Sequence, residues 1–280
     1  MCRFCAQHGD GKRWYLEASN YATELLDEAD RRGYMVRFLR DFDRNRRRVL
    51  TACELAEKVP APLAKAGKER FARHMREHHF GQPVPLEQCE AIFDTATCIV
   101  NLPCPCRTFA GKSEEGFCLA ITVAPVEDLL REGMAGYGDG PDTLAFTRLD
   151  KAEAMALLRR AEERGLMHSV WTFETPFIGA ICNCDLASGC MAMTLTVGHG
   201  AKLMWRGEDV AVLDTTACTG CGACVRRCPF AAIDRPASKG APAVLRQADC
   251  WGCGVCRSAC ASEALSLVER AAVPAVAGVW

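Results

Sequence analysis

Two runs of four cysteines near the C-terminus constrain this chain more than any other feature. The first run consists of Cys218, Cys221, Cys224 and Cys228. The second run begins 32 residues later (218 to 250) and consists of Cys250, Cys253, Cys256 and Cys260. Both follow the spacing C-x2-C-x2-C-x3-C. An internal repeat of this kind predicts two copies of one structural unit.

The spacing suits a cubic iron–sulfur cluster. Each of its four irons needs one thiolate, and three cysteines spaced three apart on a tight loop can bind three irons of one cluster. The fourth cysteine then points away and binds the other cluster. Glycines stand between the cysteines, where the backbone must turn sharply and pass close to the sulfides, at Gly220, Gly222, Gly252 and Gly254. Zinc also accepts four thiolates, but zinc ribbons use two separated pairs.

The two runs and the segment Cys228-Pro-Phe-Ala-Ala-Ile233 resemble bacterial-type two-[4Fe–4S] ferredoxins. The resemblance implies a pseudo-two-fold ferredoxin-like dicluster domain over residues 209–268. It implies that one [4Fe–4S] cluster is bound by Cys218, Cys221, Cys224 and Cys260, and the other by Cys250, Cys253, Cys256 and Cys228. The family usually has proline after both runs. Here Ala261 follows Cys260, which affects the local rigidity of that turn.

Six more cysteines lie in the middle of the chain, at Cys104, Cys106, Cys118, Cys182, Cys184 and Cys190. They include two C-x-C pairs, each with a further cysteine nearby in sequence, so they look like halves of one site. Pro103 and Pro105 bracket Cys104, which predicts an extended or turning segment and no helix there.

This middle pattern is similar to a cysteine-rich region that precedes the two-cluster module in larger ferredoxin-like proteins of anaerobic metabolism. Asp185 stands where those relatives often have another cysteine. We expect four of the six thiols to bind a metal group, most simply a third iron–sulfur cluster. Zinc and buried reduced thiols are the alternatives, and the spacing does not fix which four ligate.

Composition narrows the class of protein further. Of the 280 residues 19 are cysteine, and 34 Lys and Arg balance 35 Asp and Glu. The near-zero net charge argues against a dedicated nucleic-acid or membrane-surface binder. The N-terminal sequence lacks the plan of a signal peptide, and no apolar run reaches the roughly 18 residues of a membrane span. Abundant thiols without a secretory signal favour a reducing compartment, so the predicted location is the cytoplasm.

The hydrophobic pattern predicts an α+β fold in four parts. Residues 1–96 form a helical region, 97–208 a cysteine-rich mixed α/β region, 209–268 the two-cluster domain and 269–280 a frayed tail. We expect a helix from Trp14 to Ala29 that ends before Gly33. Asp150 and Glu153 form a capping-box pattern that predicts the start of another helix. Strands are expected at 98–100, 117–123, 167–173 and 178–181.

Several weaker features have plain structural explanations. Cys2, Cys5 and His8 have the spacing of metal ligands but provide only three donors. Surface positions on a helix explain His74, His78 and His79, and a solvated face explains Arg44, Arg46, Arg47 and Arg48. Core thiols are expected at Cys53, Cys89 and Cys98. The loop Gly136-Tyr-Gly-Asp-Gly140 does not match a dinucleotide-binding fingerprint.

These features predict an electron-transfer protein, or a subunit of a larger oxidoreductase complex, that exchanges single electrons with protein redox partners. The alternative is a reductase in which a catalytic metal or thiolate site in the middle region receives electrons from the ferredoxin module. An iron–sulfur sensor that binds DNA through basic helices is a further alternative. A carrier or subunit fits better than a self-contained enzyme, because no nucleotide, flavin or hydrolase motif is present.

Overall fold

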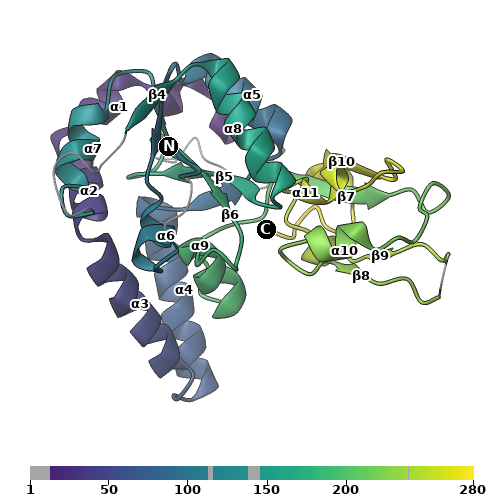
Figure 1. The fold of residues 1–280 in the computed structure, drawn as a ribbon. Coiled ribbons are helices and arrows are strands. Elements are labelled where there is room, and N and C mark those ends of the chain that lie inside the picture. The colour runs from purple at the N-terminus through teal and green to yellow at the C-terminus, as the bar shows by residue number, and fades with distance from the viewer. Residues whose placement is uncertain (1–12, 113–115, 138–145, 239) are drawn as a thin grey trace.

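The computed structural model describes residues 13–112, 116–137, 146–238 and 240–280 (Figure 1). A helix-rich body built around one antiparallel sheet lies beside a smaller C-terminal module of short strands and helices. The α+β prediction is therefore confirmed. In the described part of the chain, no helix combines the length and the apolar character that a membrane span requires.

The first part of the chain is largely helical. Two short 3-10 segments, η1 (Trp14–Leu16) and η2 (Ala18–Tyr21), precede α1 (Thr23–Asp27), α2 (Ala29–Arg40), α3 (Phe42–Ala56), α4 (Ala61–His78) and α5 (Leu86–Thr95). The predicted continuous helix from Trp14 to Ala29 is wrong, and Gly33 lies inside α2. The indole of Trp14 is wholly buried and its Nε1 donates to Gln82 Oε1 at 2.5 Å, so a distant segment determines this conformation.

A six-stranded antiparallel sheet forms the centre of the body, in the order β1-β5-β6-β3-β2-β4. Its strands are β1 (Gly81–Pro83), β2 (Cys98–Leu102), β3 (Cys118–Thr122), β4 (Thr147–Leu149), β5 (Met167–Thr172) and β6 (Ile178–Cys184). The four predicted strands are confirmed, and 167–172 and 178–184 pair as a hairpin. Residues 81–83, predicted to be part of a helical region, instead form an edge strand paired with β5.

Successive side chains along each strand point to opposite faces of the sheet, and each face is covered by its own apolar core. Ile99 and Leu119 face the core covered by α5 (Leu86–Thr95) and α8 (Lys151–Glu163). Val100 and Ala120 face the opposite core, which contains α2 and α7 (Glu127–Gly133). The predicted capping box begins α8, because Asp150 Oδ1 accepts from the Glu153 N–H at 2.8 Å and Glu153 Oε2 accepts from the Asp150 N–H at 2.9 Å.

The C-terminal module has approximate internal two-fold symmetry. Its elements are β7 (Asp209–Leu213), α10 (Ala223–Arg227), β8 (Ile233–Asp234), β9 (Val244–Leu245), α11 (Val255–Ser258) and β10 (Leu265–Glu269). β7 pairs with β10, β8 pairs with β9, and each four-cysteine run leads into one of the two short helices.

The tail is packed and not frayed, contrary to the prediction. Val276 is 2% exposed within the core of the module, and the Trp280 carbonyl accepts from Lys202 Nζ at 2.6 Å. The guanidinium of Arg270 lies over the Trp280 ring, 5.7 Å from its centroid. These contacts hold the tail against the module and tie its end to Lys202, and the C-terminus lies between module and body in Figure 1.

A polar seam joins the body to the module. Gln82 Nε2 donates to the Arg206 carbonyl at 2.7 Å and to Glu208 Oε1 at 3.1 Å. Gln88 Nε2 donates to Asp209 Oδ2 at 2.5 Å, while Arg13 pairs with Oδ1 of the same carboxylate at 3.1 Å. Burial raises the pKa of Asp209, and the nearby Arg13 and Gln88 offset part of that rise. The seam stabilises one arrangement of the two parts, because Gln82 and Gln88 donate to acceptors at residues 206–209 and Arg13 pairs with Asp209.

Candidate metal centres

The module presents its cysteines on two loops that only glycine can form. Gly252 has a φ of +73°, and a Cβ there would lie 2.1 Å from the carbonyl oxygen of Asp209. Gly220 occupies the equivalent position in the first run, with a φ of +67° and the Ala241 carbonyl oxygen 2.2 Å from the Cβ position. A left-handed backbone this close to another backbone segment has no room for a side chain.

The eight thiols of the module fall into two neighbourhoods. Burial raises the pKa of Cys224, and the neighbouring thiols of Cys218 and Cys260 raise it further. Burial likewise raises the pKa of Cys256 to about 12, with contributions from Cys250 and Cys228. Cys260 thus lies near Cys218 and Cys224 of the first run, and Cys228 lies near Cys250 and Cys256 of the second run.

A small cavity marks the second neighbourhood. Its walls include Cys228, Cys250, Cys253 and Cys256, together with the apolar side chains of Phe230, Ile233 and Leu245. Backbone N–H groups point at these sulfurs: Ala211 N donates to Cys250 Sγ at 3.4 Å and Ala232 N donates to Cys228 Sγ at 3.3 Å. Such N–H groups offset the negative charge of a thiolate cluster. Donor set, cavity and N–H groups all fit a [4Fe–4S] cluster.

The first neighbourhood is more open to solvent. Cys221 is exposed, and Cys218 and Cys260 are half-buried. Burial raises the pKa of Cys260, but the Ser262 hydroxyl and backbone N–H groups outweigh it, so the net shift is downward. The lowered pKa makes deprotonation of Cys260 easier, and metal ligation requires the thiolate.

Aromatic side chains lie between the second neighbourhood and the body. The rings of Phe230 and Trp251 stack with centroids 4.8 Å apart and planes 10° apart. The Arg206 guanidinium covers the indole of Trp251 at 5.1 Å. Both aromatic residues pack against the larger core of the body, to which Cys253 also belongs. The second neighbourhood consequently faces the body.

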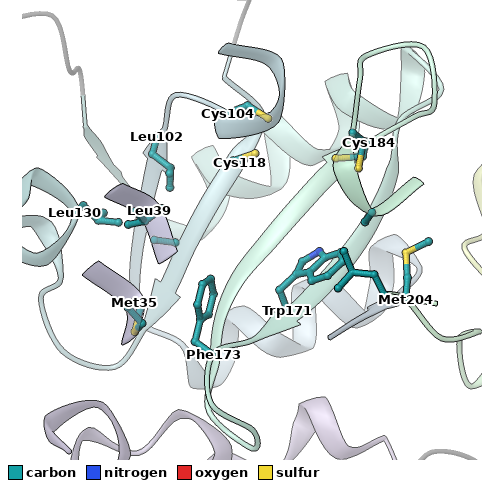
Figure 2. Packing of buried hydrophobic residues seen from close by; sticks show 14 of the residues in the cluster. Met35, Leu39, Leu102, Cys104, Cys118, Leu130, Trp171, Phe173, Cys184 and Met204 are labelled. Atoms are coloured by element: carbon teal, nitrogen blue, oxygen red, sulfur yellow. The ribbon is translucent and has the colours of Figure 1, made fainter. Parts of the chain in front are cut away.

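The six middle cysteines come together at one end of the central sheet. Cys118 begins β3, and Cys182 and Cys184 end β6, which pairs with β3. Cys104 and Cys106 flank the start of α6 (Pro105–Phe109), and Cys190 directly precedes α9 (Met191–Met193). Figure 2 shows Cys104, Cys118 and Cys184 at one end of the packed face, with Trp171 and Phe173 further along it.

The prediction that prolines exclude a helix around Cys104 is only partly right. Cys104 itself is extended, with φ −71° and ψ 113°. Pro105, however, starts α6, so Cys106 is helical. Proline is compatible with the first position of a helix, because the N–H it lacks would have no intrahelical partner there.

The six thiols lie close enough to shift one another's pKa, and we call this group the six-thiol ring. The pKa of each thiol is shifted by hydrogen bonding with two others. Followed in order, the contacts run Cys104–Cys106–Cys190–Cys184–Cys182–Cys118 and return to Cys104. The described residues contain no group of three or more His, Cys, Asp or Glu side chains placed to hold a single metal ion.

The direction of the pKa shift alternates from one thiol to the next around the six-thiol ring. Hydrogen bonds from neighbouring thiols lower the pKa of three members, reaching about 6 at Cys182 and falling well below the ordinary value at Cys104 and Cys190. The same contacts raise the pKa of the three intervening members, Cys106, Cys118 and Cys184. A thiolate accepting from two thiols is stabilised, which requires its neighbours to keep their protons.

A buried cation accompanies the six-thiol ring. Arg107 follows Cys106 and is 7% exposed, and its charge lowers the pKa of Cys104. One guanidinium nitrogen donates to the Asn183 carbonyl at 3.1 Å, and the group lies over the Phe117 ring. Nη1 is buried without a partner, and among the described residues no carboxylate pairs with this side chain. The sequence shows Arg107 in the Cys-x-Cys-Arg motif, but its burial could not be predicted.

The remaining candidates behave as ordinary structural residues. Cys53, Cys89 and Cys98 are buried singly, at most 7% exposed. His78 contacts Glu174 at 2.9 Å and His74 lies beside it on α4, whereas His79 is buried among aromatic rings and not on the surface. Asp43 pairs with Arg46 and Arg47 within α3. Cys2, Cys5 and His8, and Gly138 to Gly140 of the glycine-rich loop, lie outside the described residues.

Comparison with known proteins identifies the family of the C-terminal module, and no match covers the body. Residues 211–261 match the family of 4Fe-4S dicluster domains. The C-terminal module is therefore a ferredoxin-like dicluster domain. No curated protein and no solved structure matches the chain significantly.

Proposed function

We propose that this protein relays single electrons between protein redox partners, either alone or as a subunit of a larger oxidoreductase. The dicluster domain supports an iron–sulfur electron-transfer role. In this proposal Cys218, Cys221, Cys224 and Cys260 bind one [4Fe–4S] cluster, and Cys228, Cys250, Cys253 and Cys256 bind the other. The observation that supports the proposal is the cavity that Cys228 of the first run lines together with Cys250, Cys253 and Cys256 of the second run.

The six-thiol ring is proposed to bind a third iron–sulfur cluster. A buried guanidinium without a carboxylate is costly unless an anion lies nearby. Arg107 is such a group, and a cubane bound by thiolates carries the negative charge that would compensate it. Cys104, Cys118 and Cys184 share one continuous apolar core with Cys253, so this cluster would extend the path of the electrons from the module into the body.

The proposed location is a reducing compartment such as the cytoplasm. All 17 cysteines in the described part of the chain are free thiols, and none forms a disulfide there. Clusters bound by thiolates need those thiols reduced.

A reductase is the second candidate function. The six-thiol ring offers two thiols more than one cubane needs, which is the observation that favours chemistry at this site. In that case the dicluster domain would deliver electrons to a reaction in the body.

Iron and sulfide content after strictly anaerobic purification tests the proposal. We expect about twelve irons per chain, four for each of three cubanes. About eight would restrict clusters to the module, and zinc in place of iron would refute the assignment. A double variant, Cys221→Ser with Cys253→Ser, should lose the electron paramagnetic resonance signals of the module but keep the iron of the middle site. The single variant Cys89→Ser, at a buried thiol distant from both sites in sequence, is the matched control and should keep all twelve.

A further inference from the structure

A cavity of about 350 Å³ lies between α2 and α7, on the side of the body away from the dicluster domain (Figure 1). Sites for small molecules typically measure about 300–1,000 Å³, so this cavity has room for a small organic molecule. All of its lining residues belong to these two helices, and none of them is a cysteine. The cavity is therefore separate from every candidate metal centre described above.

Close packing fixes the two helices that form the cavity. A Cβ at Gly133, the last residue of α7, would lie 2.9 Å from Leu39 Cβ and 3.4 Å from the Val36 carbonyl oxygen, so only glycine allows α7 this close to α2. Just beyond α7, the Tyr137 hydroxyl donates to the Leu39 carbonyl at 2.7 Å. Val36 and Leu129, which are 8% and 2% exposed, form an apolar part of the cavity wall.

The charged groups of the wall are predominantly cationic. Arg32, Arg37 and Arg40 line the cavity from α2, and Glu132 lines it from α7, so these four side chains carry a net charge of +2 (three minus one). Arg32 pairs with Asp27 at 3.6 Å, and both side chains are exposed. Within the described residues, neither Arg37 nor Arg40 forms an ion pair with a carboxylate. A concave surface lined by one sign of charge attracts ligands of the opposite sign.

Gly33 makes room for one of these cations on the cavity wall. Glycine inside a helix lowers helix stability relative to alanine, so its presence in α2 has a structural cost. A Cβ at this position would lie 2.9 Å from Nη1 of Arg37, one turn further along the helix. The Arg37 side chain therefore folds back over the glycine, and the missing side chain at position 33 leaves space for its guanidinium.

We propose that this cavity binds a small organic dianion, either a phosphate monoester or a dicarboxylate, with an apolar part that contacts Val36 and Leu129. A guanidinium donates two parallel hydrogen bonds to a phosphate or a carboxylate group. Two negative charges balance the net charge of the lining residues, whereas a monoanion leaves one positive charge uncompensated. Binding at this position is independent of the number of clusters that the protein holds, and it gives the body a ligand that a plain electron relay does not need.

Calorimetric titration of the full-length protein, purified anaerobically with its clusters, tests the charge and the chemistry of the ligand. The probes are phenyl phosphate, phthalate and the monoanion benzoate. We expect one of the two dianions to bind with one-to-one stoichiometry and a Kd below about 1 mM at low salt, and benzoate to bind at least about tenfold more weakly. Tighter binding of phenyl phosphate assigns the site to phosphate monoesters, and tighter binding of phthalate assigns it to dicarboxylates. Failure of both dianions to bind, or equal affinity for benzoate, would overturn the inference.

Hydrogen–deuterium exchange with the bound dianion tests the location. Added protection should be confined to α2 and α7, and protection elsewhere without any change in these helices would overturn the inference.

Four variants separate a built site from general attraction to positive charge. Arg37→Gln should weaken binding by about tenfold, and Glu132→Gln should strengthen it by about threefold because the single acid of the wall is removed. Gly33→Ala should weaken binding by about fivefold while the melting temperature stays the same or rises, because alanine favours the helix but displaces the Arg37 guanidinium. Arg73→Gln, at an exposed arginine of α4, is the matched control and should leave the affinity unchanged. Equal losses of affinity in Arg37→Gln and Arg73→Gln, or unchanged affinity in Gly33→Ala, would overturn the inference.

Discussion

Gly252→Ala tests whether close backbone packing positions the second four-cysteine run. Two costs add at this residue. A left-handed backbone costs a residue with a side chain about 1–2 kcal/mol. The new methyl would also lie 2.1 Å from the Asp209 carbonyl oxygen, so the two segments must move apart, at about 1–3 kcal/mol for overpacking. We expect Gly252→Ala to lower the free energy of unfolding by about 2–5 kcal/mol in total.

Gly222→Ala separates these two costs. Gly222 has nearly the same φ, +70°, but its nearest neighbour in space is the Arg226 side chain at 3.8 Å. Only the first cost applies there, so the loss should be about 1–2 kcal/mol. Anaerobic thermal scans at one fixed rate, together with iron content, measure both variants. Equal melting temperatures and equal iron content in the two variants would refute the argument that the Asp209 contact shapes the second site.

Three further predictions concern buried charge and the seam. Burial lowers the pKa of His79 to about 4, so the folded protein keeps this ring neutral while the unfolded chain protonates it below about pH 6.5. The contribution of His79 to the free energy of unfolding should fall by up to about 3 kcal/mol as the pH drops from 6.5 to 4. In chemical denaturation, His79→Gln should remove this part of the pH dependence and leave the part due to His168, whose pKa burial also lowers to about 4. Arg270 is fully buried and donates to the carbonyls of residues 207, 209 and 250. Arg270→Met should therefore lower the free energy of unfolding by about 3 kcal/mol or more and make the protein lose iron faster. The exposed control Arg226→Met should do neither. The Glu87–Arg257 ion pair at 2.8 Å is partly exposed, so Glu87→Gln should change the free energy of unfolding by less than about 1 kcal/mol; a larger loss would show that the seam depends on it.

The sequence predicted those structural elements that depend on contacts between residues close together in the chain. The capping box at Asp150 and Glu153 starts α8 as expected, since both partners lie within one turn. The repeat of the cysteine runs likewise predicted the ferredoxin-like module. The helix predicted from Trp14 was wrong because the conformation there depends on distant residues. Gln82 accepts from the Trp14 indole, and Gln88 accepts from the hydroxyl of Tyr15.

The sequence grouped the six middle cysteines but gave no information on their arrangement. Two C-x-C pairs and two further cysteines indicated one site. The order of contacts around it depends on the register of β3 against β6, where Leu119 pairs with Ile181, and spacing along the chain carries no information on that register. The burial of Arg107 could not be predicted for the same reason, since burial is a tertiary property.

The polar seam has a consequence for how this protein can be dissected or recombined. A fragment starting at Asp209 would carry a carboxylate deprived of both Arg13 and Gln88, and the complementary fragment would expose those two side chains without their acceptor. A foreign ferredoxin grafted onto this body would need a matching acid at the same point. Substitutions at 13, 82 and 88 are therefore expected to be inherited together with changes at 208 and 209, so that body and dicluster domain diverge as one unit.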